Sequence, residues 1–168
     1  MKILTFTLLK CMDKILCWNT RGLNQIRKQV EVWNFILSQH AGLVSLLETK
    51  VKSSNMGQLY TRMFGNWCFT SNGSMHPNGR IIVAWNPLSF DTSILAMDSQ
   101  FIHCLVSPKS GAPCFHVTFI YAFNDMKDRL SLWNFLKNWK DRIMIPGCSW
   151  EISIVFWKWM RGLALLSE

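Results

Sequence analysis

Polar residues that could hold a cation and a phosphate follow two apolar runs near the start of the chain. Residues 15–18 lead into Asn19, and residues 43–47 lead into Glu48. A glutamate is a natural ligand for Mg²⁺, which binds one or two carboxylates together with waters and phosphate oxygens. An asparagine can orient that carboxylate, or a phosphate oxygen, by hydrogen bonding. These residue types predict phosphate chemistry assisted by a hard cation.

A third apolar run adds two further hydrogen-bonding side chains. Residues 115–120 lead into Tyr121 and Asn124, which could both donate to a phosphate. Each residue has a simpler reading when taken alone. A glutamate at the end of a strand is often a solvated edge residue, and a tyrosine is often a core aromatic with its hydroxyl at the rim.

The elements that must position these residues are a series of short strands and three helices. We expect strands at 14–18, 43–47, 67–70, 80–85, 94–97, 101–106 and 115–121, separated by turns rich in Asn, Pro and Gly. Helices are expected at 25–39, 54–64 and 126–140. This order predicts α/β layers around a mixed, largely antiparallel sheet with flanking helices.

Apolar periodicity predicts which helix faces are buried. In the first helix, Ile26, Val30, Trp33 and Leu37 share one face. In the third helix, Asp125 is a candidate cap, and the inner face would carry Leu130, Trp133 and Leu136 or Lys137. The carboxyl ends of the buried strands would then meet at one edge, where site residues gather in layered α/β folds.

Together and in this order, the motifs resemble the endonuclease/exonuclease/phosphatase superfamily, which has the DNase I-like fold. The resemblance is strongest to the endonuclease domain of plant LINE-type (non-LTR) retrotransposons. Four motifs carry it: Trp18-Asn19-Thr20-Arg21-Gly22, Glu48-Thr49-Lys50, Gly79-Arg80-Ile81-Ile82-Val83-Ala84-Trp85 and Tyr121-Ala122-Phe123-Asn124. It implies the N-terminal part of a four-layer α/β sandwich, here incomplete, over residues 12–143.

The resemblance also implies roles for these residues. Glu48 would be the principal ligand of Mg²⁺, or of Mn²⁺ in its place, with Asn19 as its supporting partner. Tyr121 and Asn124 would contact the scissile phosphate of a DNA substrate. Three cationic side chains would bind the DNA backbone without reading its sequence: Arg21, Lys50 and Arg80.

The rest of the family's machinery is missing from the sequence. The family continues with a strand ending in Gly-Asp-Phe-Asn and later a Ser-Asp-His motif, yet no aspartate follows Asp141 and no histidine follows His116. Loss of the general base and of metal-side carboxylates should cost on the order of 10⁴-fold in rate. We therefore expect a Mg²⁺-dependent endonuclease of retrotransposon origin whose activity is absent or vestigial.

The end of the chain has the properties of an out-of-frame tail. When the chain is back-translated from Ile143 and the reading frame is shifted by one base, a permitted choice of codons encodes a hydrophobic strand followed by the missing Gly-Asp-Phe-Asn. Two residues of this shifted-frame translation do not depend on codon choice. Met144 followed by Ile145 forces the aspartate at its second position, and Trp150 followed by Glu151 forces the glycine. We expect residues 144–168 to be a non-homologous, truncating tail. As it stands, 150–166 reads as an amphipathic or buried helix, too short and too charged for a membrane span.

Bulk composition is consistent with a DNA partner and an intracellular location. The net charge of +8 over 168 residues suits a polyanion, although a basic protein without such a partner would look the same. No signal peptide is evident, and residues 1–11 read as an added leader before Met12. The six cysteines show no metal-ligand spacing and are expected to be buried free thiols in the cytoplasm or nucleus. The four histidines show no paired spacing.

Three readings remain open from sequence alone. The chain is an inactive endonuclease remnant, a non-catalytic basic nucleic-acid-binding fragment, or a product that does not fold stably because the sheet facing the first one is lost. The sequence does not define an oligomeric state.

Overall fold

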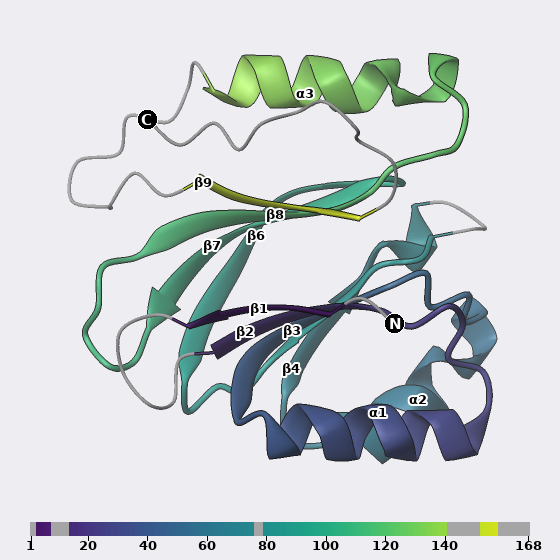
Figure 1. Cartoon of the computed structure of the whole chain (residues 1–168), viewed down its shortest axis with the longest axis vertical. Coiled ribbons are helices and arrows are strands. Elements are labelled where there is room, and N and C mark those ends of the chain that lie inside the picture. The colour runs from purple at the N-terminus through teal and green to yellow at the C-terminus, as the bar shows by residue number, and fades with distance from the viewer. Residues whose placement is uncertain (1–2, 8–13, 76–78, 141–151, 158–168) are drawn as a thin grey trace.

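Two β-sheets lie face to face, and helices cover their outer faces, so the chain has a helix–sheet–sheet–helix arrangement (Figure 1). This computed structural model describes residues 3–7, 14–75, 79–140 and 152–157. The layered α/β class predicted from sequence is confirmed. The expected leader and tail lie mostly outside the described residues, so the boundaries at 11/12 and 143/144 stay predictions.

The first sheet has five strands in the order β1-β2-β3-β5-β4. Their bounds are β1 (Ile3–Thr7), β2 (Lys14–Asn19), β3 (Ala41–Leu47), β4 (Cys68–Ser71) and β5 (Ile82–Trp85). Strands β2 and β3 run parallel, and the other neighbours are antiparallel. The parallel pair brings the ends of β2 and β3 to the same edge of the sheet.

The second sheet has four strands in the order β6-β7-β8-β9. Their bounds are β6 (Phe90–Asp98), β7 (Phe101–Pro108), β8 (Phe115–Tyr121) and β9 (Ile152–Trp157). The first three strands are antiparallel neighbours, and β9 runs parallel to β8. The helical reading of the tail is therefore wrong for Ile152–Trp157, where β-branched and aromatic residues pair with the free edge of β8.

The main core lies between the two sheets. Strands β3 and β8 are buried along their whole length, and residues on one face of β7, such as Ile102 and Cys104, point into this core. Fully burying a large apolar side chain contributes ~1.5–3 kcal/mol. The expectation that the facing sheet is lost is wrong, because β6, β7 and β8 supply it within this chain.

Helices α1 (Ile26–Ser38) and α2 (Met56–Met63), with the 3-10 turn η1 (Ser53–Asn55), cover the outer face of the first sheet (Figure 1). The predicted inner face of α1 is wrong in part, although Trp33 packs against the core of this layer as expected. Ile26 and Val30 are more than half exposed, whereas Val32 and Ile36 are buried. The helix carries two apolar stripes, and the packing of Leu23 and the sheet selects the second one.

Helix α3 (Leu130–Lys140), preceded by the 3-10 turn η3 (Lys127–Arg129), covers the second sheet (Figure 1). Its predicted inner face is also wrong in part, because Leu130 is exposed and Leu132 is buried. The ring of Phe135 stacks on Phe101 of β7, with ring centres 3.9 Å apart. The helix predicted over 126–140 begins only at Leu130, so Asp125 does not cap it; the Asp125 carboxylate instead accepts a hydrogen bond from the Lys127 amide at the start of η3.

A buried asparagine ties the two sheets together. Asn72, in the 3-10 turn η2 (Asn72–Ser74), is fully buried. Its amide nitrogen donates to the carbonyls of Asp98 and Ser99, and its side-chain oxygen accepts from the Ile81 amide. The turn β4–β5 is thereby fixed to the turn β6–β7 in the other sheet.

The cysteines differ from the sequence expectation in two places. Cys17 and Cys104 are buried free thiols, and burial raises the pKa of each to about 12. Cys68 is a free thiol but is exposed, and Cys114 is disulfide-bonded. No helix in the described part of the chain is long and apolar enough to cross a membrane.

Candidate functional site

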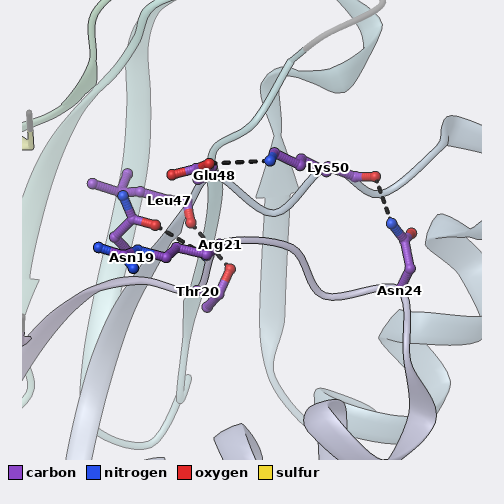
Figure 2. A network of polar contacts seen from close by, with 7 residues as sticks. All are labelled: Asn19, Thr20, Arg21, Asn24, Leu47, Glu48 and Lys50. Carbon is purple, nitrogen blue, oxygen red and sulfur yellow. Dashed lines mark hydrogen bonds and ion pairs between the residues drawn. The ribbon is translucent and has the colours of Figure 1, made fainter. Parts of the chain in front are cut away.

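The loop that follows β2 and the loop that follows β3 are hydrogen-bonded to each other at the edge of the first sheet (Figure 2). The Thr20 amide and hydroxyl both donate to the Leu47 carbonyl, at 2.9 and 3.0 Å. The amides of Gly22 and Leu23 donate to the carbonyls of the second loop, at Glu48 and Thr49. The β2–β3 ladder therefore continues past the strands into the residues predicted to do chemistry.

The backbone of these loops is held in an uncommon conformation. Arg21, Glu48 and Lys50 have positive φ angles of 51°, 54° and 54°. Non-glycine residues rarely adopt this region, and it costs on the order of 1–3 kcal/mol each unless the surroundings enforce it. The hydrogen bonds between the loops provide that enforcement, so the fold fixes where these three side chains leave the backbone.

Asn19 ends β2 and is buried, with 6% of its surface exposed. Its side-chain oxygen accepts a hydrogen bond of 3.0 Å from the Arg21 amide. The residue predicted to support a metal therefore shapes the turn that carries Arg21.

Glu48 directly follows β3, and its carboxylate forms an ion pair with Lys50. The Lys50 Nζ lies 3.1 Å from the Glu48 Oε1 (Figure 2). Glu48 has a side chain that is only 15% exposed, against 49% for Lys50. The carboxylate is thus shielded on the protein side, while the ammonium is open to solvent.

Tyr121 reaches the same place from the second sheet. The Arg80 guanidinium lies over its ring, 5.8 Å from the ring centre, and the Arg80 carbonyl accepts from the Thr49 amide. Burial raises the pKa of the Tyr121 hydroxyl, and the Glu48 carboxylate raises it further, while the positive charge of Arg80 opposes both effects. Three residues predicted from separate motifs therefore act on one another across the two sheets.

The remaining predicted residues lie at the rim. Arg21 and Asn124 are exposed. Asn124 stands in the loop after β8, where the Arg129 guanidinium donates to the carbonyls of Phe123 and Asn124 at 2.6 and 2.7 Å. The structure brings Asn19, Glu48, Lys50, Arg80 and Tyr121 to one edge and leaves Asn124 beside it.

Sequence reasoning missed two residues that position the loop after β8. Gln100 is fully buried. Its amide nitrogen donates to the Asp128 carbonyl, and its oxygen accepts from the Phe123 amide. Arg129 holds the same loop from the other side. Neither residue belongs to a motif, and their spacing from Tyr121 carries no periodic signal.

Two of the histidines lie beside each other. His103 and His116 are buried together on the α3 side of the second sheet, with Nε2 of His103 3.3 Å from Nδ1 of His116. The other ring nitrogen of His103 contacts the Thr118 hydroxyl at 2.7 Å. Burial lowers the pKa of both, that of His103 to about 4. They are paired in space although their spacing in the sequence shows no pair, and they lie on the opposite face of the sheet from the core that contains Tyr121.

The described residues do not form a site that fits Mg²⁺ or Mn²⁺. Nowhere in the described ranges do three His, Cys, Asp or Glu side chains gather closely enough to hold a metal ion. At the predicted position, Glu48 is already paired with a lysine, and the Asn19 oxygen already accepts a hydrogen bond. Because the Glu48 carboxylate is already engaged, it is not available as the carboxylate ligand that Mg²⁺ combines with waters and phosphate oxygens.

Several solved structures share the fold. TDP2 from D. rerio complexed with a single-strand DNA product matches with a TM-score of 0.54, 11% identity and 77% of this chain covered. The human Nocturnin catalytic domain with bound sulfate matches with a TM-score of 0.51, 14% identity and 84% covered. The endonuclease domain of TRAS1, a telomere-specific non-LTR retrotransposon, gives 0.53, 10% and 77%. No protein-family model and no curated protein matches the chain.

These similarities establish the fold. It is the DNase I-like fold, with two sheets and flanking helices. The chain spans 55% of the TDP2 chain, 63% of the Nocturnin chain and 54% of the TRAS1 chain, which is less than two thirds of each.

Proposed function

We propose that this chain is a remnant of a Mg²⁺-dependent DNA endonuclease of LINE-type retrotransposon origin. It keeps the phosphate-binding part of the site and has lost the cleaving part. The ion pair between Glu48 and Lys50 is the observation that carries this proposal. A carboxylate that is satisfied by a lysine is poorly suited to recruit the ion that the ancestral chemistry needs.

The ancestry rests on both sequence and fold. The motifs around Asn19, Glu48 and Tyr121 resemble plant LINE-type endonucleases, and one similar solved structure is the endonuclease domain of a non-LTR retrotransposon. A role inside the cell, in the cytoplasm or nucleus, is part of the proposal, because DNA would be the partner.

The side chains at the edge favour binding of nucleic acid without cleavage. Arg21, Lys50 and Arg80 contribute three positive charges against the single negative charge of Glu48. Such a surface attracts phosphates of any sequence, and its affinity falls steeply with salt. Among the described histidines, the buried pair His103 and His116 lies on the far face of the second sheet and is therefore not placed to act as a general base at this edge.

Nicking of a supercoiled plasmid with Mg²⁺ tests the loss of cleavage. We expect the purified chain to nick no faster than the Glu48→Ala variant, and we expect both to contain folded protein by circular dichroism. Nicking by the unmodified chain that Glu48→Ala abolishes would show that the half-site suffices, and the proposed inactivity would be wrong.

Binding is measured separately with a fluorescent single-stranded oligonucleotide. Salt-dependent binding without cleavage supports the proposal. An oligonucleotide that fails to bind at low salt contradicts it.

A further inference from the structure

We propose that the Lys50 ammonium takes the position of a cation beside Glu48, so that the site binds phosphate oxygens directly and without a divalent ion. This inference rests on the proposed phosphate-binding function and specifies how that function works. The ligand class is a phosphodiester, contacted through its charged oxygens.

The position of the ammonium is set by the backbone. Glu48 and Lys50 are two residues apart and share the same positive φ of 54°. The intervening Thr49 amide donates to the Arg80 carbonyl, and the Lys50 carbonyl accepts from the Asn24 side chain at 3.0 Å (Figure 2). These bonds fix the loop on both sides of the ion pair, so the lysine is directed at the carboxylate by the fold.

The electrostatic surroundings disfavour a divalent ion at the same carboxylate. A metal ion would have to displace the Lys50 ammonium from its 3.1 Å contact. Arg80 adds a second positive charge at this edge of the sheet, where its guanidinium lies 5.8 Å from the centre of the Tyr121 ring. Like charges at such separations repel strongly in a partly buried site.

The ammonium keeps donors for a ligand. A lysine has three N–H groups, and the Lys50 side chain is about half exposed, whereas Glu48 is largely shielded. A phosphate that approaches from solvent therefore meets the cation before the carboxylate. Glu48 then acts as the group that orients the lysine, and Arg80 and Arg21 extend the positive edge.

A metal titration without nucleic acid tests the inference directly. Free Mn²⁺ is followed by electron paramagnetic resonance with the unmodified chain, Lys50→Met, and Lys52→Met as the matched control. Lys52 is an exposed lysine two residues further along. We expect Lys50→Met to bind Mn²⁺ at least about tenfold more tightly than the unmodified chain and the control. Adding Glu48→Gln to Lys50→Met should remove that gain.

A second variant protects the test against misfolding. Lys50→Asn removes the charge with a residue that tolerates positive φ, and it should behave as Lys50→Met does. Equal Mn²⁺ affinity of the unmodified chain and both charge-removing variants would overturn the inference.

Binding of the fluorescent single-stranded oligonucleotide tests how the site contacts phosphate. Binding by the unmodified chain should be the same in EDTA and in Mg²⁺ at constant ionic strength. Lys50→Met should lose roughly tenfold in affinity in EDTA, and Lys50→Arg should retain most of it. Binding that requires Mg²⁺ overturns the inference. Failure of every variant to bind the oligonucleotide contradicts the proposed function instead, while the Mn²⁺ titration still decides the role of Lys50.

Discussion

The Arg80 guanidinium lies over the Tyr121 ring at 5.8 Å, and this contact joins the two sheets at the candidate site. Arg80 precedes β5 in one sheet, and Tyr121 ends β8 in the other. A cation over an aromatic face is attracted by the ring quadrupole. The contact therefore fixes a positive charge at the point where the motifs of both sheets converge.

Replacing Arg80 by Met should weaken nucleic-acid binding through loss of one phosphate contact. The slope of log affinity against log salt for the single-stranded oligonucleotide should become shallower by about 0.7. Arg62→Met is the matched control, because Arg62 is exposed on α2 and outside the site. An unchanged slope in Arg80→Met would mean that this charge does not contact the nucleic acid.

Replacing Asn72 by Ala should destabilise the whole domain. The change leaves two carbonyls and the Ile81 amide without the partner they have in a fully buried position. The free energy of unfolding should fall by about 2 kcal/mol or more, measured by urea denaturation. Asn34→Ala, at an exposed position of α1, should change it by less than about 0.5 kcal/mol. Equal effects of the two changes would remove Asn72 from its role as the tie between the sheets.

Replacing Gly79 by Ala should displace the segment that carries Arg80. A Cβ at Gly79 would clash with the Asn72 carbonyl oxygen, which is backbone and has little freedom to move. We expect a lower melting temperature together with weaker oligonucleotide binding. Gly57→Ala is the control, since nothing lies within 4 Å of its Cβ in α2. That change should leave binding intact and stabilise the helix by roughly 0.5–1 kcal/mol. Normal binding by a folded Gly79→Ala would contradict this expectation.

Acid should destabilise the protein through the buried histidine pair. The pKa of His103 is lowered from 6.5 to about 4 by burial and by the charge of His116, so the folded state disfavours the charged form. The resulting stability is present above pH 6.5 and is lost as the pH falls towards 4. The loss from His103 is on the order of 3 kcal/mol, and the lowered pKa of His116 adds to it.

Urea denaturation of His103→Asn at several pH values measures this effect. The variant should show a flatter dependence of unfolding free energy on pH over this window than the unmodified chain. His40→Asn, at an exposed residue that follows α1 with a φ of 52°, serves as the control. A pH dependence that is identical in His103→Asn and in the unmodified chain would exclude the pair as its source.

Local pattern was sufficient for most of the elements and for the ends of the strands that carry the site, but it missed β1 and β9. The helix expected at 25–39 is α1, and the strands expected at 43–47 and 115–121 lie within β3 and β8. Apolar periodicity failed to predict the buried face of a helix where the helix carries two apolar stripes of equal periodicity. In α1 it selected the stripe containing Ile26 and Val30, because only the sheet beneath the helix decides that Val32 and Ile36 are buried.

The sequence by itself determined the α/β class and the strand ends that carry Asn19, Glu48 and Tyr121, because alternation and turn residues are local properties of the chain. Tertiary structure alone decided that Arg80 lies over Tyr121, that Lys50 satisfies Glu48 and that His103 lies against His116. The first and third contacts depend on how strands pair and sheets stack. The second depends on a positive φ that the neighbouring loop enforces through hydrogen bonds, and no spacing of residue types encodes that constraint.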